Sequence, residues 1–378
     1  MKILVLCYEY PPLGGGGGRV AKTVAEALVR RGHEVRVQTA ALGWRSHQET
    51  IDGVEVFRTA SGRRRPERCS VLEMLSYCVT SIRPTLAHID RWQPDVIHTH
   101  FVVPTGALAW LVHRLTGTPY VLTAHLGDVP GGAPGQTDAL FRFIAPFARI
   151  FWHAAAGLTA VSAWVCTLAT RGYGRAPKII HNGIRLDDTA ARTDAPGDTV
   201  ELVFIGRLNP QKCPLFLLEV LALVPAKNWR LTIVGDGELM PALREKLAAS
   251  GLGDRVQLTG WLAGPEVEQV LHRSHIFLLP STFEGLPVAA AEALKHSLAL
   301  LVSDIPGLHD VVDEGVNGYR LPIGDTAAWS ARISALLADP AALAALAALQ
   351  RASWAKAQDF ALPHIAEEYE AVLEGARA

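Results

Sequence analysis

Short apolar runs alternate with amphipathic stretches along the whole chain, and this alternation limits the fold more than any other feature. A short, mostly apolar run is typical of a buried strand, whereas a surface helix repeats its apolar residues about every three or four positions. In the first half, the pattern predicts strands at residues 2–7, 33–39, 54–58, 96–99, 120–124, 157–162 and 178–181. The helices predicted between them span residues 20–31, 71–92, 105–115 and 163–171.

The same alternation restarts after residues 187–199, which are poor in large apolar side chains and which we interpret as a linker. Beyond the linker, the pattern predicts strands at residues 201–205, 230–234, 256–259, 276–280, 300–303 and 318–321. Helices are predicted at residues 214–223, 240–249, 265–273 and 288–295, and residues 308–312 continue the alternation. Residues 325–378 are predicted to be mainly helical.

Strands that alternate with helices form parallel sheets covered by helices on both faces. We therefore expect an α/β protein with two doubly wound, Rossmann-like domains, residues 1–186 and residues 200–355, on either side of the linker. Such folds bind their ligands at the carboxyl ends of the strands. Two domains facing each other across a cleft would therefore hold the functional site in that cleft.

The net charge of the chain limits the kinds of molecule that it is expected to bind. The chain has 36 Lys and Arg against 37 Asp and Glu, a balance that argues against a nucleic-acid-binding protein. A basic cluster at Arg63, Arg64, Arg65 and Arg68 suits either a solvated loop or a contact with anionic lipid headgroups or a phosphorylated acceptor. Five widely spaced cysteines without a Cys-x-x-Cys pair favour reduced thiols in a cytoplasm and no zinc site.

Neither a signal peptide nor a membrane span is predicted. The first apolar run is too short for the core of a signal peptide. The most apolar later stretch, residues 141–165, is interrupted by Arg142, Pro146, Arg149 and His153, whereas a bilayer span needs about 20 apolar residues. We interpret this stretch as a buried or membrane-grazing helix followed by a strand. The expected location is the cytoplasm, with peripheral contact at the inner face of the membrane left open.

Three loops carry residue types that suit a phosphorylated ligand, and the first is the run from Gly14 to Gly18. A glycine loop between a strand and a helix lets backbone N–H groups approach an anion, and the helix dipole adds positive potential. Five glycines exceed what one tight turn needs. A nicotinamide cofactor is less well supported, because its site places an acid at the end of the second strand and residues 37–39 are Val-Gln-Thr.

The second loop carries Arg207 and Lys212 and follows the strand at residues 201–205. Two cations at the carboxyl end of a strand can clamp a diphosphate and stabilise its charge as it leaves.

The third loop carries Glu284 and leads into a helix that starts at Pro287, with Glu292 near the second turn. The start of the helix can hold a phosphate while the two carboxylates on either side bind sugar hydroxyls. The simpler interpretation makes Glu284 a turn residue and Glu292 a surface residue, and it does not explain why the two bracket Gly285, Leu286 and Pro287.

These motifs resemble retaining glycosyltransferase family 4, the group 1 glycosyltransferases with the GT-B fold. The Glu284-x7-Glu292 spacing and the Gly206-Arg207…Lys212 segment are similar to that family's second domain. The first half adds three similar segments: Tyr10-Pro11-Pro12 with Gly15-Gly16, Arg31-Gly32-His33-Glu34-Val35 and His181-Asn182-Gly183. The resemblance covers residues 1 to about 320 and implies that residues 356–378 form a helix returning to the first domain.

The resemblance implies roles for individual residues. Arg207 and Lys212 would bind the donor diphosphate, and Glu284 would hold the transferred sugar. The other donor-binding residues implied are Gly15 and Gly16 in the first domain, Trp261 at the base, the backbone of Gly285, Leu286, Pro287 and Val288 at the phosphate, and Glu292 at the ribose.

Histidines of the first domain complete the expected site. His125 would lie beside the donor sugar, although Leu126 follows it where the family usually has glycine. Asp128 would contact the acceptor. His98 and His100 either face the cleft or pack against their neighbours.

The implied reaction retains the anomeric configuration and needs no metal and no cofactor beyond the nucleotide-diphosphate sugar, and the chain has no Asp-x-Asp motif. A sugar-nucleotide epimerase or hydrolase, a phosphorylase with an aldehyde cofactor on a lysine, and a non-catalytic nucleotide-sugar binding protein remain alternatives. The donor base and sugar stay open. The acceptor is a cell-surface glycan, a lipid-linked glycan or a small molecule, and residues 141–152 with the arginine cluster favour a membrane-bound one.

Overall fold

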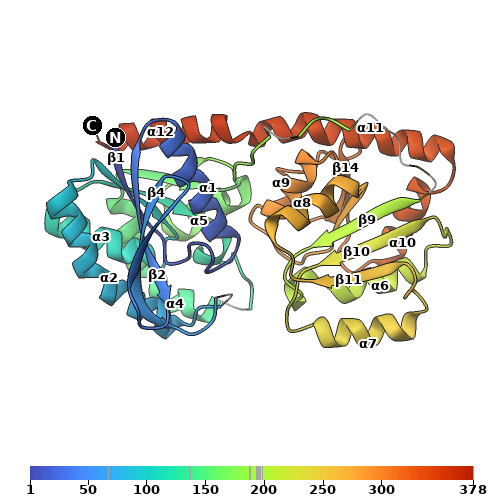
Figure 1. Ribbon diagram of the computed structural model, residues 1–378, viewed down its shortest axis with the longest axis horizontal. Helices are drawn as coiled ribbons and strands as arrows, with labels where there is room; N and C mark the ends of the chain where they lie inside the picture. Colours follow the sequence, from blue (N-terminus) through green and yellow to red (C-terminus); the bar gives the residue numbers. More distant parts are fainter. Residues whose placement is uncertain (67, 136–137, 187–188, 193–196, 198, 378) are drawn as a thin grey trace. The chain divides into compact units, whose positions relative to one another are not determined.

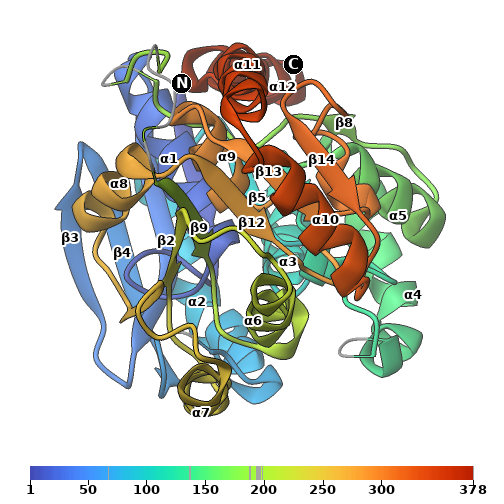
Figure 2. The same ribbon diagram turned by 90° about the vertical axis from the view of Figure 1, so that its right-hand side faces the viewer.

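The chain folds into two compact units in the computed structural model, which describes residues 1–66, 68–135, 138–186, 189–192, 197 and 199–377. Unit 1 comprises Met1–Gly183 and Ala361–Ala378, and unit 2 comprises Ile184–Phe360 (Figures 1 and 2). Within the predicted linker, residues 187–188, 193–196 and 198 lie outside the described residues.

Unit 1 is built on an eight-stranded sheet with the strand order β3-β4-β2-β1-β5-β6-β7-β8. Its strands are β1 Lys2–Leu6, β2 Glu34–Leu42, β3 His47–Ile51, β4 Val54–Arg63, β5 Val96–His100, β6 Tyr120–Ala124, β7 Gly157–Ala160 and β8 Lys178–Ile179. The pairs are parallel except β3 with β4. Every residue of the central strands β5 and β6 is buried, as expected for a parallel sheet with both faces covered.

Strand β3 was not predicted, because its residues are mostly polar and half-buried or exposed. It forms an antiparallel hairpin with β4 through Asp52 and Gly53, whose φ angles of 50° and 82° are both left-handed. Positive φ at two successive turn residues is the geometry that two-residue hairpins favour.

In the described part of unit 1, the sheet is covered by helices α1 Gly16–Arg30, α2 Val71–Trp92, α3 Thr105–Thr116, α4 Asp138–Ala154, α5 Ala163–Tyr173 and α12 Leu362–Arg377. Helices α2 to α5 pack in succession, each against the next, whereas α12 lies beside α1 (Figure 1). Helix α1 begins at Gly16, four residues before the predicted start, because the glycine loop runs directly into its first turn. Glu370 of α12 pairs with both Arg31 and His33, so the final helix is tied to the end of α1.

Unit 2 has a six-stranded, fully parallel sheet with the order β11-β10-β9-β12-β13-β14. Its strands are β9 Val200–Ile205, β10 Trp229–Val234, β11 Val256–Gly260, β12 Ile276–Leu279, β13 Ala299–Ser303 and β14 Gly318–Leu321. Its helices are α6 Pro214–Ala222, α7 Met240–Ser250, α8 Gly264–Arg273, α9 Val288–Lys295, α10 Thr326–Leu336 and α11 Pro340–Ala357. The prediction that residues 308–312 continue the alternation is wrong: Leu308 ends a short 3-10 helix, Pro306–Leu308, and residues 309–312 form neither an α-helix nor a strand.

The apolar stretch at residues 141–165 folds as predicted into a helix, α4, followed by strand β7. Among the described residues, no single helix has both the length and the apolar character to cross a bilayer, and one pair, Thr326–Leu336 with Pro340–Phe360, passes only when its two parts, bent by 102°, are taken together.

Candidate functional site

The loops at the carboxyl edge of the unit 2 sheet are held together by close backbone contacts that only glycine allows. A Cβ atom at Gly235, which has a φ of 132°, would lie 1.9 Å from the carbonyl oxygen of Gly206. A Cβ atom at Gly307 would lie 1.8 Å from the carbonyl oxygen of Glu284. The loops after β10 and β13 therefore press against the two loops that carry the predicted site residues.

Lys212 and Glu284 form the central contact of this edge. The Lys212 Nζ lies 2.5 Å from Glu284 Oε1, and both side chains are largely buried. Asn209 Oδ1 accepts the Lys212 backbone N–H at 3.1 Å and fixes the turn that carries the lysine. The pairing was not predicted, although both residues were, because they are 72 positions apart in the chain.

Two further bonds join the loop of Lys212 to the loop of Glu284. The Gln211 side-chain amide donates to the Phe283 carbonyl at 2.8 Å. The Thr282 backbone N–H donates to the Gln211 carbonyl, also at 2.8 Å. The position of the lysine relative to the glutamate is therefore set by the backbone as well as by the ion pair.

Helix α9 starts directly after the Glu284 loop. Pro287 is its N-terminal cap with an extended backbone, and within the described part of the chain no side chain caps the helix. Its first-turn N–H groups and its dipole give this end a positive potential suited to an anion. Gly285, Leu286 and Pro287 are buried, and Val288 is half-buried.

Three other residues predicted to bind the donor belong to unit 2, and they differ in how far they are exposed to solvent. Arg207 is exposed in the loop that also carries Lys212. Glu292 is half-buried in α9. Trp261 follows edge strand β11 and is 79% exposed, so its ring is open to a planar ligand.

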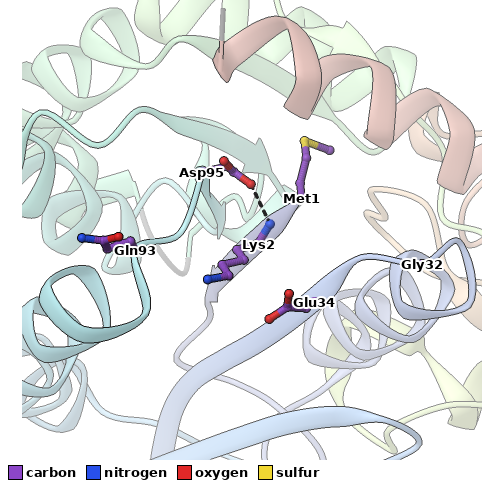
Figure 3. Close-up of a pocket in the computed structure, with 6 residues that line it drawn as sticks. All are labelled: Met1, Lys2, Gly32, Glu34, Gln93 and Asp95. Carbon is purple, nitrogen blue, oxygen red and sulfur yellow. Dashed lines mark hydrogen bonds between the residues drawn. The ribbon is translucent and has the colours of Figure 1, made fainter.

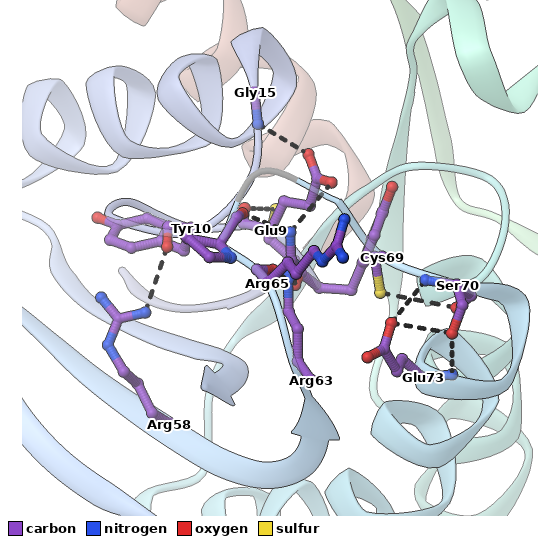
Figure 4. A network of polar contacts seen from close by, with 12 residues as sticks. Glu9, Tyr10, Gly15, Arg58, Arg63, Arg65, Cys69, Ser70 and Glu73 are labelled. Carbon is purple, nitrogen blue, oxygen red and sulfur yellow. Dashed lines mark hydrogen bonds and ion pairs between the residues drawn. The ribbon is translucent and has the colours of Figure 1, made fainter. Parts of the chain in front are cut away.

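In unit 1, the glycine loop is already occupied by a side chain of the chain itself (Figure 4). The Glu9 carboxylate accepts the Gly15 N–H through Oε2 at 3.1 Å. Gly16 opens helix α1. A Cβ atom at Gly17 would lie 2.4 Å from the Phe101 ring, so this loop depends on glycine for packing. Sequence reasoning missed Glu9, which carries no motif of its own.

Arg63 forms hydrogen bonds with the backbone around this loop. Its side chain is completely buried and donates to the carbonyls of Tyr8 at 3.3 Å and Pro66 at 2.9 Å. It also lies 3.7 Å from Glu9 Oε1. Both interpretations of the basic cluster, a solvated loop or a lipid contact, are therefore wrong for Arg63, because the backbone carbonyls around the glycine loop provide its hydrogen-bond acceptors.

His125 belongs to an array of three buried histidines. Its Nε2 lies 3.3 Å from Nδ1 of His100, and the rings of His100 and His98 are 4.4 Å apart. Burial lowers the pKa of His125 to about 4 and that of His98 to about 3. Burial likewise lowers the pKa of His100. All three rings are therefore neutral near pH 7, and His98 and His100 pack within β5.

Asp128 positions His125, and its predicted contact with an acceptor stays a prediction. One carboxylate oxygen accepts the His125 backbone N–H at 2.8 Å, and the other accepts that of Val102 at 2.5 Å. The side chain is buried. Burial raises the pKa of the Asp128 carboxyl, while these N–H donors act in the opposite direction. The residue joins the loops that follow β5 and β6.

A shallow pocket lies at the opposite, amino edge of the unit 1 sheet (Figure 3). The Lys2 backbone N–H donates to Asp95 there at 2.8 Å. The residues that line the pocket are Met1, Lys2, Gly32, Glu34, Gln93 and Asp95. None of them was predicted as a site residue. Within the described residues, no group of three or more His, Cys, Asp or Glu side chains is arranged to hold a metal ion.

Comparison with known proteins matches both units. A family model described as a glycosyl transferase 4-like domain matches residues 15–183, and one described as glycosyl transferases group 1 matches residues 199–339. The chain is 30% identical over 318 residues to D-inositol 3-phosphate glycosyltransferase 1 of Catenulispora acidiphila, covering 75% of this chain and 73% of that one.

The chain is also similar to a second glycosyltransferase in sequence and to a solved structure in fold. The chain is 28% identical to UDP-Gal:alpha-D-GlcNAc-diphosphoundecaprenol alpha-1,3-galactosyltransferase of Escherichia coli, over 61% of this chain and 63% of that one. Its fold is similar to that of Anabaena HepE, solved with UDP-glucose, with a TM-score of 0.76, 20% identity and 99% of each chain covered. The two Rossmann-like sheets and these matches show that the chain belongs to the group 1 glycosyltransferases of the GT-B type.

Proposed function

We propose that the protein is a retaining, metal-independent glycosyltransferase that moves a sugar from a nucleotide-diphosphate sugar to an acceptor hydroxyl. The observation that carries the proposal is the Lys212–Glu284 pair beside the start of α9. A cation, a carboxylate and a positive helix end at one sheet edge suit a ligand that has both phosphate and hydroxyl groups.

The donor diphosphate would bind between Arg207, Lys212 and the first turn of α9. A lysine ammonium has three N–H donors, so Lys212 can keep its bond to Glu284 and still bind a phosphate oxygen. Trp261 would stack on the nucleobase, because its ring is exposed at the same edge. Glu292 would bind the ribose hydroxyls. The structure of HepE with UDP-glucose supports this class of donor.

Retention follows if the leaving group departs first and the acceptor then attacks the face that the leaving group has left. The bond between the anomeric carbon and the phosphate oxygen breaks, and the electron pair goes to the diphosphate. Arg207, Lys212 and the α9 dipole stabilise that charge. The acceptor oxygen then bonds to the anomeric carbon on the same face, and its proton passes to the departing phosphate oxygen. Glu284 would hold the sugar hydroxyls during this exchange.

Unit 1 would contribute uncharged hydrogen-bonding groups to the binding of the donor. Neutral His125 can donate a hydrogen bond to a sugar hydroxyl without adding a second cation, and Asp128 and His100 hold it in place. Gly15 and Gly16 would allow close approach of the donor phosphates. Because Glu9 accepts the Gly15 N–H in this structure, a phosphate would compete with that carboxylate.

The acceptor class we propose is a glycan or glycolipid of cell-surface assembly. The Escherichia coli relative is named for a diphosphoundecaprenol-linked acceptor, which supports this class. A small polar acceptor is the competing possibility, favoured by the name of the Catenulispora relative.

Site variants and product analysis test the proposal. Glu284→Gln removes the charge while keeping the shape, and we expect transfer to fall by at least about a hundredfold. The exposed Glu245→Gln on α7 is the matched control and should retain activity. Nuclear magnetic resonance of the product should show the donor's anomeric configuration, and a chelator should leave the rate unchanged.

Three outcomes would contradict the proposal. An inverted product would exclude retention. Conversion of the donor at the same rate without acceptor would favour the epimerase or hydrolase alternative. Tight donor binding without turnover on polyprenyl-diphosphate sugars, glycolipids and simple glycosides would favour a binding protein.

A further inference from the structure

Helix α4 has an apolar stripe on its outer face. Phe143 is 74% exposed, Phe147 62% and Ile150 49%, and Pro146 between them is also exposed. Positions separated by three, four and seven residues lie on one side of a helix, so these four side chains form a continuous stripe. The opposite face is buried through Phe141, Ala148 and Trp152. Helix α4 is therefore apolar on both faces, and one of them is open to solvent.

A row of basic side chains runs along one flank of this stripe. Arg142, Arg149 and His153 are exposed and follow one another at intervals of seven and four residues, which puts them on the same line of the helix. The Arg149 Nε donates to the Gly172 carbonyl, which fixes the direction of its guanidinium. The stripe and the row together form an amphipathic surface of apolar and cationic groups.

The surrounding chain segment is strongly cationic, although the whole chain has a net charge of −1. Residues 96–183 contain six Lys or Arg and only two Asp. One of the two, Asp128, is buried and bonded to backbone N–H groups. The charge that this part of unit 1 presents to solvent is therefore positive.

The same helical layer carries a second apolar stripe. Val71, Leu72, Leu75 and Val79 lie on the amino-terminal half of α2 and are 49% to 79% exposed. Helix α3 packs against both α2 and α4, and its Leu115 is 61% exposed. Exposed apolar side chains therefore occur on all three of these helices.

We propose that this surface, Phe143, Pro146, Phe147 and Ile150 with Arg142 and Arg149, docks the protein on a membrane that contains anionic lipids. The apolar stripe would enter the boundary between headgroups and acyl chains, while the arginines bind the anionic headgroups. A second copy of the chain fits less well, because the two paired surfaces would carry charge of the same sign.

Vesicle sedimentation with the full-length protein tests the proposal. We expect the protein to sediment with vesicles of phosphatidylcholine and phosphatidylglycerol and to stay in solution with phosphatidylcholine alone. Raising the salt concentration should weaken the binding. The variant Phe143→Ser/Phe147→Ser should reduce binding by at least about tenfold, because two large apolar anchors are lost. Arg142→Glu should reduce it separately through the charge.

Matched controls change exposed residues of unit 2. Leu223→Ser/Ile323→Ser removes two apolar side chains that are 58% and 50% exposed, and Arg244→Glu reverses an exposed cation on α7. Both should bind vesicles like the unchanged protein. Failure to sediment with anionic vesicles, or unchanged binding by the phenylalanine variant, would overturn the proposal. So would self-association that the phenylalanine variant abolishes. None of these readouts depends on transfer activity, so the experiments can refute the proposed docking surface without refuting the proposed glycosyltransferase activity, and the reverse.

Discussion

Glu284 shows how neighbouring residues hold a single residue of the candidate site. Its side chain pairs with Lys212. Gly307 lies so close to the Glu284 backbone that a Cβ atom on Gly307 would be 1.8 Å from the Glu284 carbonyl oxygen. The carboxylate is thus fixed from two sides, by an ion pair and by backbone contact. Such support is what lets a site group keep one geometry before a ligand binds.

Gly307→Ala is therefore expected to destabilise unit 2 and to displace Glu284. The added methyl group must push the Glu284 backbone aside, at a cost of about 1–3 kcal/mol. Chemical denaturation measures the loss of stability, and donor titration measures the loss of binding. Gly253→Ala is the matched control, because a Cβ atom at Gly253 meets no atom within 4 Å. Equal stability of the two variants would contradict the tight contact.

At the scale of elements, apolar periodicity predicted most strands and helices because burial on a parallel sheet requires it. The pattern failed where burial was partial, as in the mostly polar strand β3, and where glycine extended a helix, as in α1. It also singled out candidate site residues by the loops that carry them, and their roles stay predictions, but it did not predict which residues they contact. Arg63 was expected at the surface, either in a solvated loop or against an anionic lipid or phosphorylated acceptor, whereas its side chain is completely buried beside the glycine loop.

The three buried histidines, His98 and His100 in β5 and His125 in the loop after β6, predict that the folded protein loses stability at acid pH. Burial lowers the pKa of His98 to about 3 and of His125 to about 4, and it lowers the pKa of His100 as well. In the unfolded chain these rings titrate near pH about 6.5, so between about 6.5 and 4 the unfolded state binds more protons. The free energy of unfolding should then fall as the pH falls, by up to about 1.4 kcal/mol per pH unit for each ring.

Urea denaturation at a series of pH values from about 7 to 5 measures this slope. His100→Asn removes one of the three rings, so its stability should depend less steeply on pH than that of the unchanged protein. Asp128, whose pKa burial raises, acts in the opposite direction, and comparing the two proteins at each pH cancels its contribution. Parallel slopes would show that His100 is protonated equally in the folded and unfolded states.

At the scale of the whole molecule, the chain has two compact units with separate sheets. Each sheet has its own buried strands, β5 and β6 in unit 1 and β12 and β13 in unit 2, so each unit has a core that can melt by itself. Most of the proposed donor contacts, those through Arg207, Lys212, Glu284 and α9, belong to unit 2, whereas Gly15 and Gly16 belong to unit 1. A ligand that binds only the folded form of one unit stabilises that unit directly.

A nucleoside diphosphate should therefore raise the melting temperature of the transition that belongs to unit 2. At a ligand concentration about a hundredfold above Kd, the stabilisation is about 2.7 kcal/mol. Differential scanning calorimetry measures the shift, and Gly307→Ala identifies the unit 2 transition because it lowers that transition alone. Arg207→Ala/Lys212→Ala should abolish the shift, since it removes the cations that would grip the diphosphate, whereas Arg244→Ala, which changes an exposed arginine on α7, should keep it. A shift of equal size in the double variant would mean that the nucleotide binds elsewhere, and the proposed donor site would then be wrong.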